Sequence, residues 1–350
     1  MQRGFINYVV AVVIAAGVGV ALAWALITTP SAVLAWLNQD EMGKSAYERV
    51  AAIVARPVLP PPLPITLTFV GDIMLDRGVA KSYKENGGLD WLFEGVKPIG
   101  ESDILFGNLE GPISDRGRNV GSKYSFRMAT SSAPALASVG FDVLSVANNH
   151  AGDWSVPAFT DTLQYLEQNN IVAVGGGLTR AGARAVKVVE VRGVKVGYLG
   201  FSDVGPEWLR VRDDAPGILL TNDPEFESII SMASSQVDVL VVSFHWGEEY
   251  KTLANERQKQ LANQALVAGA KLVIGHHPHV VEPIERSDES LVAYSLGNFI
   301  FDQGFSEETM QGLALTVRLN PDGGIKDYQT TIVKLSPEFK PTLEVSQSHE

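Results

Sequence analysis

Short apolar runs alternate with amphipathic stretches through the middle of this chain. The runs are rich in β-branched residues and predict strands; they cover 65–75, 103–108, 141–147, 171–174, 237–244, 272–275 and 291–295. The run at 237–244 is almost continuously apolar, which is typical of a strand buried on both faces. Apolar residues at spacings of three and four predict a helix over 155–166, capped by Ser155, and a second helix is expected over 255–269. Strands that alternate with helices indicate an α/β layered fold.

Two further segments have the pattern of β-hairpins. The first covers 185–201 and turns at Arg192-Gly193, and the second covers 313–335 and turns at 320–324. We expect the main domain to end at residue 338, and residues 339–350 to form a loose tail.

The N-terminal segment has a different pattern. Residues 4–39 contain no charged side chain, and residues 8–27 are almost entirely apolar. A helix of that length crosses a bilayer core at about 1.5 Å per residue. We therefore expect residues 1–30 to be a membrane anchor, although Ala21-Leu22-Ala23 resembles the cleavage site of a signal peptide and keeps that alternative open. Arg3 favours an N-terminus inside the cell, which predicts a single-pass protein of the cell membrane with an extracytoplasmic domain.

A proline-rich stretch separates this segment from the predicted strands. Pro57-Val58-Leu59-Pro60-Pro61-Pro62-Leu63-Pro64 excludes a helix and indicates a stiff polyproline spacer. Residues 31–64 are therefore expected to be a juxtamembrane segment and linker, and the soluble domain is expected over 65–338.

Composition narrows the classes of function. The chain has 350 residues, with 28 Lys and Arg against 40 Asp and Glu, a formal net charge of −12. This acidic balance argues against nucleic acid as a partner, since nucleic-acid binding needs a basic surface. The absence of cysteine excludes disulfides, thiolate metal sites, iron–sulfur clusters and a cysteine nucleophile.

Histidines, carboxylates and amides gather directly after the predicted strands. The motifs are Gly71-Asp72, Asn108-Leu109-Glu110, Asn148-Asn149-His150, His245-Trp246-Gly247-Glu248 and Gly275-His276-His277-Pro278-His279. Each motif alone is compatible with a structural role, but ligands bind at the carboxyl ends of strands in α/β sheets, so the set indicates one polar site.

The donor types in this set favour a divalent metal. Nitrogen and oxygen ligands without sulfur suit Mn, Fe, Zn or Mg. We expect His277 and His279, two residues apart on an extended chain, to face the same way. One or two ions are compatible with the set, and two ions about 3.5–4 Å apart could hold a phosphoryl group and its attacking water.

These motifs resemble those of the CapA family, the poly-γ-glutamate capsule synthesis proteins, which are similar to a branch of the calcineurin-like metallophosphoesterases. The matching stretches are 69–75, 108–110, 148–150, 245–249, 275–279 and 294–299. The resemblance implies a layered, metallophosphoesterase-like sandwich of two β-sheets flanked by helices, preceded by one N-terminal transmembrane helix.

The resemblance also assigns roles by position. The implied metal ligands are Asp72, Glu110, Asn149, His245, His277 and His279. His150 matches a catalytic histidine that protonates a leaving oxygen or stabilises charge on a phosphoryl group. The expected supporting or substrate-contacting residues are Asn108, Glu248, His276 and Asn298. Glu248 is expected either to orient His245 or to be a solvated surface residue.

The chain departs from the family pattern in places that bear on activity. Met74 stands where a histidine ligand is usual, and thioether sulfur is a poor ligand for a hard metal. Asp153-Trp154-Ser155 replaces the usual Asp-Tyr-Gly. An asymmetric pair of ions, or a single ion, is then plausible.

Three functions follow from these observations. The first is an anchored accessory protein for the synthesis or export of a poly-γ-glutamate capsule, with other membrane subunits as partners and an anionic polymer as ligand. The second is a metal-dependent phosphoesterase or related hydrolase with an extracytoplasmic substrate. The third is a surface binding protein with a degenerate, non-catalytic site.

Overall fold

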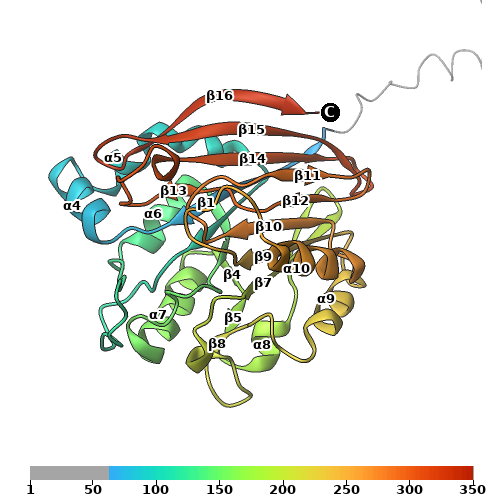
Figure 1. Ribbon diagram of the computed structural model, residues 1–350, viewed down its shortest axis with the longest axis horizontal. Helices are drawn as coiled ribbons and strands as arrows, with labels where there is room; N and C mark the ends of the chain where they lie inside the picture. Colours follow the sequence, from blue (N-terminus) through green and yellow to red (C-terminus); the bar gives the residue numbers. More distant parts are fainter. Residues whose placement is uncertain (1–62, 350) are drawn as a thin grey trace, which may run out of the picture. The chain divides into compact units, whose positions relative to one another are not determined.

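The predicted strands assemble into two sheets. The computed structural model describes residues 63–349, and Figure 1 shows their arrangement. The larger sheet has the order β16 (Pro341–His349), β15 (Ile325–Leu335), β14 (Gln311–Leu319), β1 (Ile65–Ile73), β2 (Ile104–Leu109), β3 (Phe141–Ser145) and β4 (Val172–Val174), with β13 (Asn298–Ile300) also paired to β1. Strands β1 to β4 run parallel, whereas β14, β15 and β16 extend the sheet in antiparallel fashion.

The second sheet also has a parallel centre. Its order is β11 (Ile284–Arg286), β12 (Leu291–Ala293), β10 (Leu272–His276), β9 (Val239–His245), β7 (Val194–Ser202) and β6 (Lys187–Val191). A short two-stranded ladder joins β5 (Gly176–Gly177) to β8 (Gly217–Ile218). Both predicted hairpins are confirmed, as β6–β7 and β14–β15.

Helices cover the outer face of each sheet. The α-helices are α4 (Arg77–Glu85), α5 (Leu89–Phe93), α6 (Ser132–Val139), α7 (Ser155–Gln168), α8 (Arg180–Arg184), α9 (Phe226–Ser234) and α10 (Glu256–Val267), and the 3₁₀ turns are η1 (Glu94–Glu101), η2 (Glu207–Leu209) and η3 (Glu308–Met310). Helices α4 to α7 pack on the larger sheet and α8 to α10 on the smaller. The predicted helix over 255–269 is confirmed as α10, which starts with a capping box because the Asn255 side chain accepts from the Gln258 N–H. The α/β layered fold is therefore confirmed.

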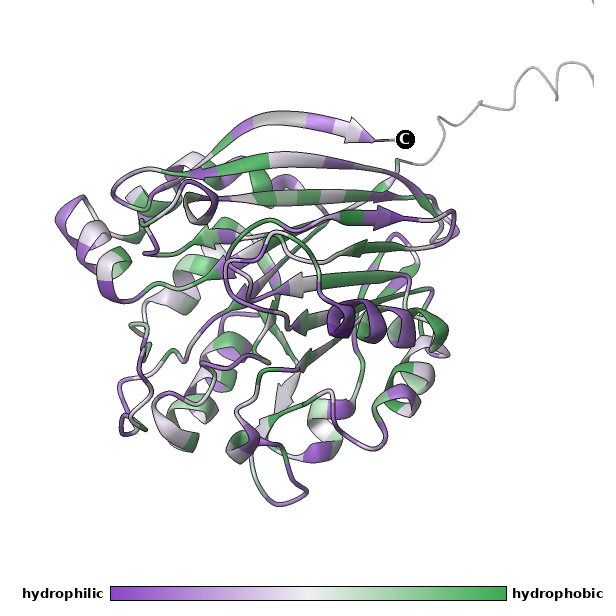
Figure 2. Ribbon diagram, in the orientation of Figure 1, coloured by the Kyte–Doolittle hydropathy of each residue, from purple (hydrophilic) through white to green (hydrophobic). Residues whose placement is uncertain are grey.

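A largely apolar layer holds the two sheets together. Alternate side chains of β1 and β2 face those of β7, β9 and β10 across this layer. Phe106 lies at its centre, with its ring stacked on Tyr198 at 5.8 Å and 5.7 Å from the ring of Phe69. Figure 2 shows the hydrophobic residues concentrated along the strands of both sheets, as burial between layers requires.

Strand register places the polar motifs at one end of this layer. Asp72 is paired with Asn108 on one side and with Asn298 on the other. In the second sheet His245 is paired with His276. Because the central strands of each sheet are parallel, these residues end their strands at the same edge.

Some expectations differ from the structure or fall outside it. Segment 339–350, expected to be a tail, instead supplies strand β16, because its backbone pairs with β15 from residue 341 onward. Ser155 is the first residue of α7 and Trp154 is its N-cap, so the predicted cap was wrong by one residue. The predicted anchor, the juxtamembrane segment and the linker up to residue 62 lie outside the described residues. Within 63–349 no helix combines the length and the apolar character needed to cross a membrane.

We expect Phe106→Ala to lower the free energy of unfolding by about 3–5 kcal/mol, because it opens a cavity where the sheets meet. Urea unfolding followed by tryptophan fluorescence measures this change. Leu253→Ala is the matched control, since Leu253 is 74% exposed and its truncation should change stability little. Equal losses in both variants would contradict the role given to the layer between the sheets.

Candidate metal centre

Asp72 lies at the junction of the two sheets and is fully buried. Its Oδ1 accepts a hydrogen bond from Asn108 Nδ2 at 2.8 Å, and its Oδ2 accepts one from the backbone N–H of His277 at 3.2 Å. The chain just before Asp72 packs closely against the backbone of Gly297. Only glycine fits at position 71, since a Cβ there would lie 1.9 Å from the carbonyl oxygen of Gly297. Burial favours the neutral acid, but His279, His276 and Asn108 favour the carboxylate, and the balance lowers the pKa of Asp72.

Glu110 is the second buried carboxylate, directly after β2. Its side chain is fully buried, and neither of its oxygens has a hydrogen-bond partner among the described residues. Oε1 lies 3.6 Å from His279 Nε2 and 3.8 Å from His150 Nε2. Burial, which outweighs the attraction of His279, raises the pKa of Glu110 well above its usual value. A buried carboxylate that accepts no hydrogen bond is costly, and a bound cation would satisfy both oxygens.

His150 follows β3 in a tight turn and points its Nε2 toward Glu110. Its Nδ1 lies 2.7 Å from Asp153 Oδ2, so that nitrogen carries the proton when the ring is neutral. Asp153 also accepts from the N–H of Phe126 and the hydroxyl of Ser122, which ties the turn to the loop before α6. The ring of Phe126 lies 4.1 Å from that of His150 and limits its movement.

Two amides hold the His245 ring in place. Its Nε2 lies 2.8 Å from Asn149 Oδ1, and its Nδ1 lies 3.4 Å from Asn108 Nδ2. Burial, reinforced by His277, lowers the pKa of His245 well below its usual value, so the ring is neutral and able to act as a ligand. Of the two alternatives for Glu248, the structure agrees with the solvated one, since Glu248 is exposed and the amides of Asn108 and Asn149 contact the His245 ring.

The next strand brings in His276, which is also buried. Both of its ring nitrogens lack hydrogen-bond partners in the described part of the chain, and Nδ1 lies 3.6 Å from Asp72 Oδ1. Gly275 allows this close packing, because a Cβ there would lie 1.9 Å from the Tyr294 carbonyl oxygen.

The loop after β10 turns two more imidazoles inward. His277 and His279 both have positive φ, +99° and +58°, which is uncommon for residues with a side chain. We expected an extended chain here, and that was wrong: the left-handed backbone at both positions makes the rings converge. Asn298 Oδ1 lies 3.0 Å from His279 Nδ1, and Glu110 and Asp72 outweigh burial and raise the pKa of His279 to about 9.

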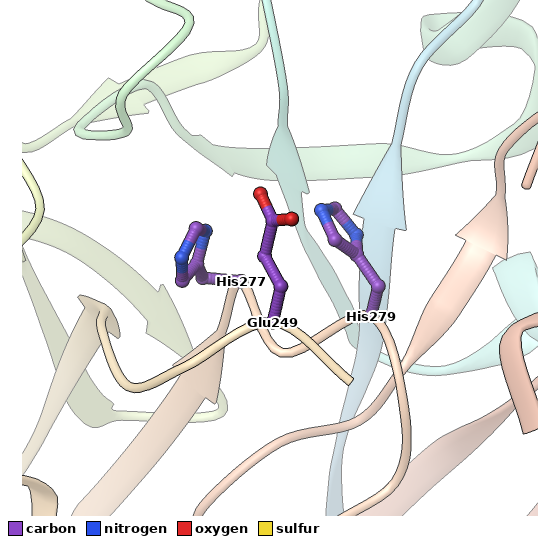
Figure 3. Close-up of side chains that lie close together, drawn as sticks. All are labelled: Glu249, His277 and His279. Carbon is purple, nitrogen blue, oxygen red and sulfur yellow. The ribbon is translucent and has the colours of Figure 1, made fainter. Parts of the chain in front are cut away.

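Two sets of ligand atoms result from this arrangement. Asp72, Glu110 and His245 form a fully buried set, and a second set combines the buried His277 and His279 with the exposed Glu249. Within each set the candidate ligand atoms lie within 4.8 Å of one another. Figure 3 shows the Glu249 carboxylate between the two imidazoles. The donors fit a divalent cation, and Asn149 and His150 lie beside them.

The predicted site residues thus come together with few exceptions. Glu248 is one exception. Met74, which stands where the family usually has a histidine ligand, is buried in the core, and its sulfur accepts a hydrogen bond from the Asp76 N–H. Glu249 and Asp153 also lie in the cluster, although neither was among the predicted site residues. Glu249 follows the His-Trp-Gly motif and Asp153 follows His150 by three residues, but neither spacing shows which way the side chain points. Whether the cluster holds a metal stays a prediction.

Comparison with known proteins establishes the class of protein. Residues 66–303 match the model of the bacterial capsule synthesis protein family PGA_cap, and the chain belongs to that family.

Two proteins from Bacillus species are similar to this chain in sequence. The chain is 39% identical over 246 residues to the PGA biosynthesis protein CapA of Bacillus subtilis (strain 168), covering 69% of this chain and 64% of the relative. It is 34% identical over 251 residues to the capsule biosynthesis protein CapA of Bacillus anthracis, covering 69% of this chain and 61% of the relative. The chain therefore spans somewhat less than two thirds of these two proteins. Among solved structures, a 5′-nucleotidase precursor from Thermus thermophilus aligns with a TM-score of 0.45 and 16% identity, over 80% of this chain and 56% of that one.

Acid should destabilise the metal-free protein partly through His276. Burial lowers the pKa of His276 from 6.5 to about 4. Between these pH values the unfolded chain binds the extra proton, so the free energy of unfolding falls as pH drops, by up to about 1.4 kcal/mol per pH unit. In urea unfolding with a chelator at pH 6.5 and 4.5, His276→Gln should lose less stability than the wild type. Equal losses would contradict this assignment.

Proposed function

We propose that this chain is a membrane-anchored, extracytoplasmic accessory protein for the synthesis or export of a poly-γ-glutamate capsule, and that its strand-end site holds one or two divalent ions. Its family and its two Bacillus relatives support the capsule role. The apolar stretch at 8–27 and the single Arg3 before it support anchoring with the domain outside.

The observation that carries the metal site is the buried carboxylate of Glu110, neither oxygen of which accepts a hydrogen bond from a described residue. Burial of such a group without compensation costs several kcal/mol, on the order of a lost charged hydrogen bond or more. The residues that would hold the ions are Asp72, Glu110, Asn149, His245, His277 and His279. Bound there, a divalent ion would polarise a carboxylate, amide or phosphoester oxygen and lower the pKa of a bound water.

The protein side chains divide the remaining work. Asn108 holds the Asp72 carboxylate and Asn298 holds the His279 ring, so both face the cluster. Asp153 keeps the proton of His150 on Nδ1, which leaves Nε2 toward Glu110 free to exchange a proton with a ligand. A polymer with one carboxylate per residue is a fitting ligand for a cation held by such a set, despite the net charge of −12 on the chain.

A second candidate function is metal-dependent hydrolysis of a phosphoester or amide. The pair formed by His150 and Asp153 favours it, because a histidine oriented by a carboxylate beside a metal cluster is suited to general acid–base chemistry. A site used only for binding has no need of this pair.

Metal content tests the proposed site. After chelator treatment and incubation with Mn²⁺ or Zn²⁺, the purified full chain should retain one to two ions per chain on dialysis, as measured by elemental mass spectrometry. The double variant His277→Ala/His279→Ala should lose them, and His349→Ala, which lies on β16, should keep them. Wild-type protein that stays metal-free under these conditions would refute the metal site.

Turnover separates the two candidate functions. If the site hydrolyses phosphoesters or γ-glutamyl bonds, His150→Gln should lower kcat by about 10²-fold or more while metal content stays unchanged. Steady-state assays with bis(p-nitrophenyl) phosphate and poly-γ-glutamate measure this. Metal-loaded wild-type protein that binds poly-γ-glutamate without cleaving either substrate would instead favour the capsule accessory role.

A further inference from the structure

The loop after β9 is anchored so that Glu249 faces the histidines. Trp246, fully buried before the loop, donates from Nε1 to the Tyr294 carbonyl oxygen at 2.8 Å. Gly247 turns the chain with a φ of +84°, against the side chain of Gln258. Tyr250 then donates its backbone N–H to the carbonyl oxygen of Pro278 at 2.8 Å. Tyr250, which follows Glu249, is therefore hydrogen-bonded to Pro278, which lies between His277 and His279.

A chain of side-chain contacts closes the same arrangement from the other side. Tyr250 accepts at its hydroxyl from Gln303 Nε2 at 3.2 Å, and Gln303 accepts at Oε1 from Asn298 Nδ2 at 3.2 Å. Asn298 contacts His279 through its other amide atom. The ring of Tyr250 also lies 6.2 Å from that of His279. The position of Glu249 is thus tied to the position of His279 by backbone and side-chain contacts.

The Glu249 carboxylate lies close to both imidazoles without forming an ion pair with either. Its oxygen lies within 4.8 Å of a ring nitrogen of both His277 and His279. The carboxylate also interacts with the hydroxyl of Tyr250, where it adds to burial in raising the pKa of that tyrosine. Ligand atoms held about 2.0–2.2 Å from one divalent ion in a tetrahedral site lie roughly 3–3.5 Å apart, so the exposed Glu249 side chain would rotate inward to bind an ion together with both rings. Figure 3 shows the three side chains converging on one space.

We propose that Glu249 is a metal ligand, which completes with His277 and His279 an ion site on the solvent-facing side of the centre. This inference rests on the proposed metal site and adds a ligand that the strand-end motifs do not include. Asp72, Glu110 and His245 are all buried, whereas Glu249 is exposed on a surface loop. The ion held by Glu249 is accordingly the one that exchanges with solvent and meets an incoming anionic ligand first.

The neighbouring glutamate provides a matched control. Glu248 is exposed, has the same charge and lines a surface hollow of about 290 Å³ with Lys251, Asn255 and Gln258, beside the start of α10. It belongs to neither set of candidate ligands in the described part of the chain. Glu248→Gln and Glu249→Gln therefore change the net charge of the same loop equally, and only the second removes a ligand.

The test measures Mn²⁺ binding to the full-length chain, with free Mn²⁺ followed by electron paramagnetic resonance during titration. We expect Glu249→Gln to lose one bound ion or to bind it at least about tenfold more weakly, with faster release to a chelator. Glu248→Gln should match the wild type. Circular dichroism verifies that both variants are folded. We expect this result, because both glutamates are exposed and contribute little to the core.

The possible results distinguish failure of the Glu249 ligand from failure of the proposed metal site. If the wild type binds Mn²⁺ and Glu249→Gln binds it equally well, or if Glu248→Gln is weakened as much, Glu249 is not a ligand and the buried site remains. If the wild type binds no Mn²⁺ and no Zn²⁺ in a parallel dialysis, the proposed metal site fails and the inference fails with it.

Discussion

The burial of two carboxylates where the sheets meet is the constraint on which the site depends. Desolvation disfavours charge at both Asp72 and Glu110, so each needs compensation. Asp72 receives it from Asn108 on its own sheet and from the His277 N–H on the other, which links the two sheets at this edge. Glu110 receives no such hydrogen bond among the described residues, so its burial is left uncompensated in this way. The imidazoles and amides of the site lie around this carboxylate.

The apolar layer and the polar edge depend on each other. Phe69 and Phe106 precede Asp72 and Glu110 on β1 and β2, and they fix the separation of the sheets against Tyr198. Because side chains at this edge come from both sheets, their spacing follows from the packing of the layer beneath them. A site built in this way takes its spacing from the strand ends, and the loop that carries Glu249 is fastened to it by the hydrogen bond from Tyr250 to Pro278.

Much of the fold follows from local sequence pattern. The β6–β7 and β14–β15 hairpins are correct because Gly-containing turns separate alternating apolar runs. Strand β16 was missed, because its pairing depends on β15 rather than on a strong apolar pattern of its own. The site was predictable as a set of residue types at strand ends. The choice between Glu248 and Glu249 was not, since it depends on the turn at Gly247 and on a hydrogen bond to distant Pro278.

The loop that carries His277 and His279 has a backbone conformation that lowers stability but directs both imidazoles into the site. A left-handed conformation costs a residue with a Cβ roughly 1–2 kcal/mol, and glycine far less. Replacement of His277 or His279 by glycine would therefore relax the loop while it removed an imidazole. Selection for stability alone would favour glycine at both positions, so the histidines mark places where this chain keeps a less stable loop for the sake of the groups it presents.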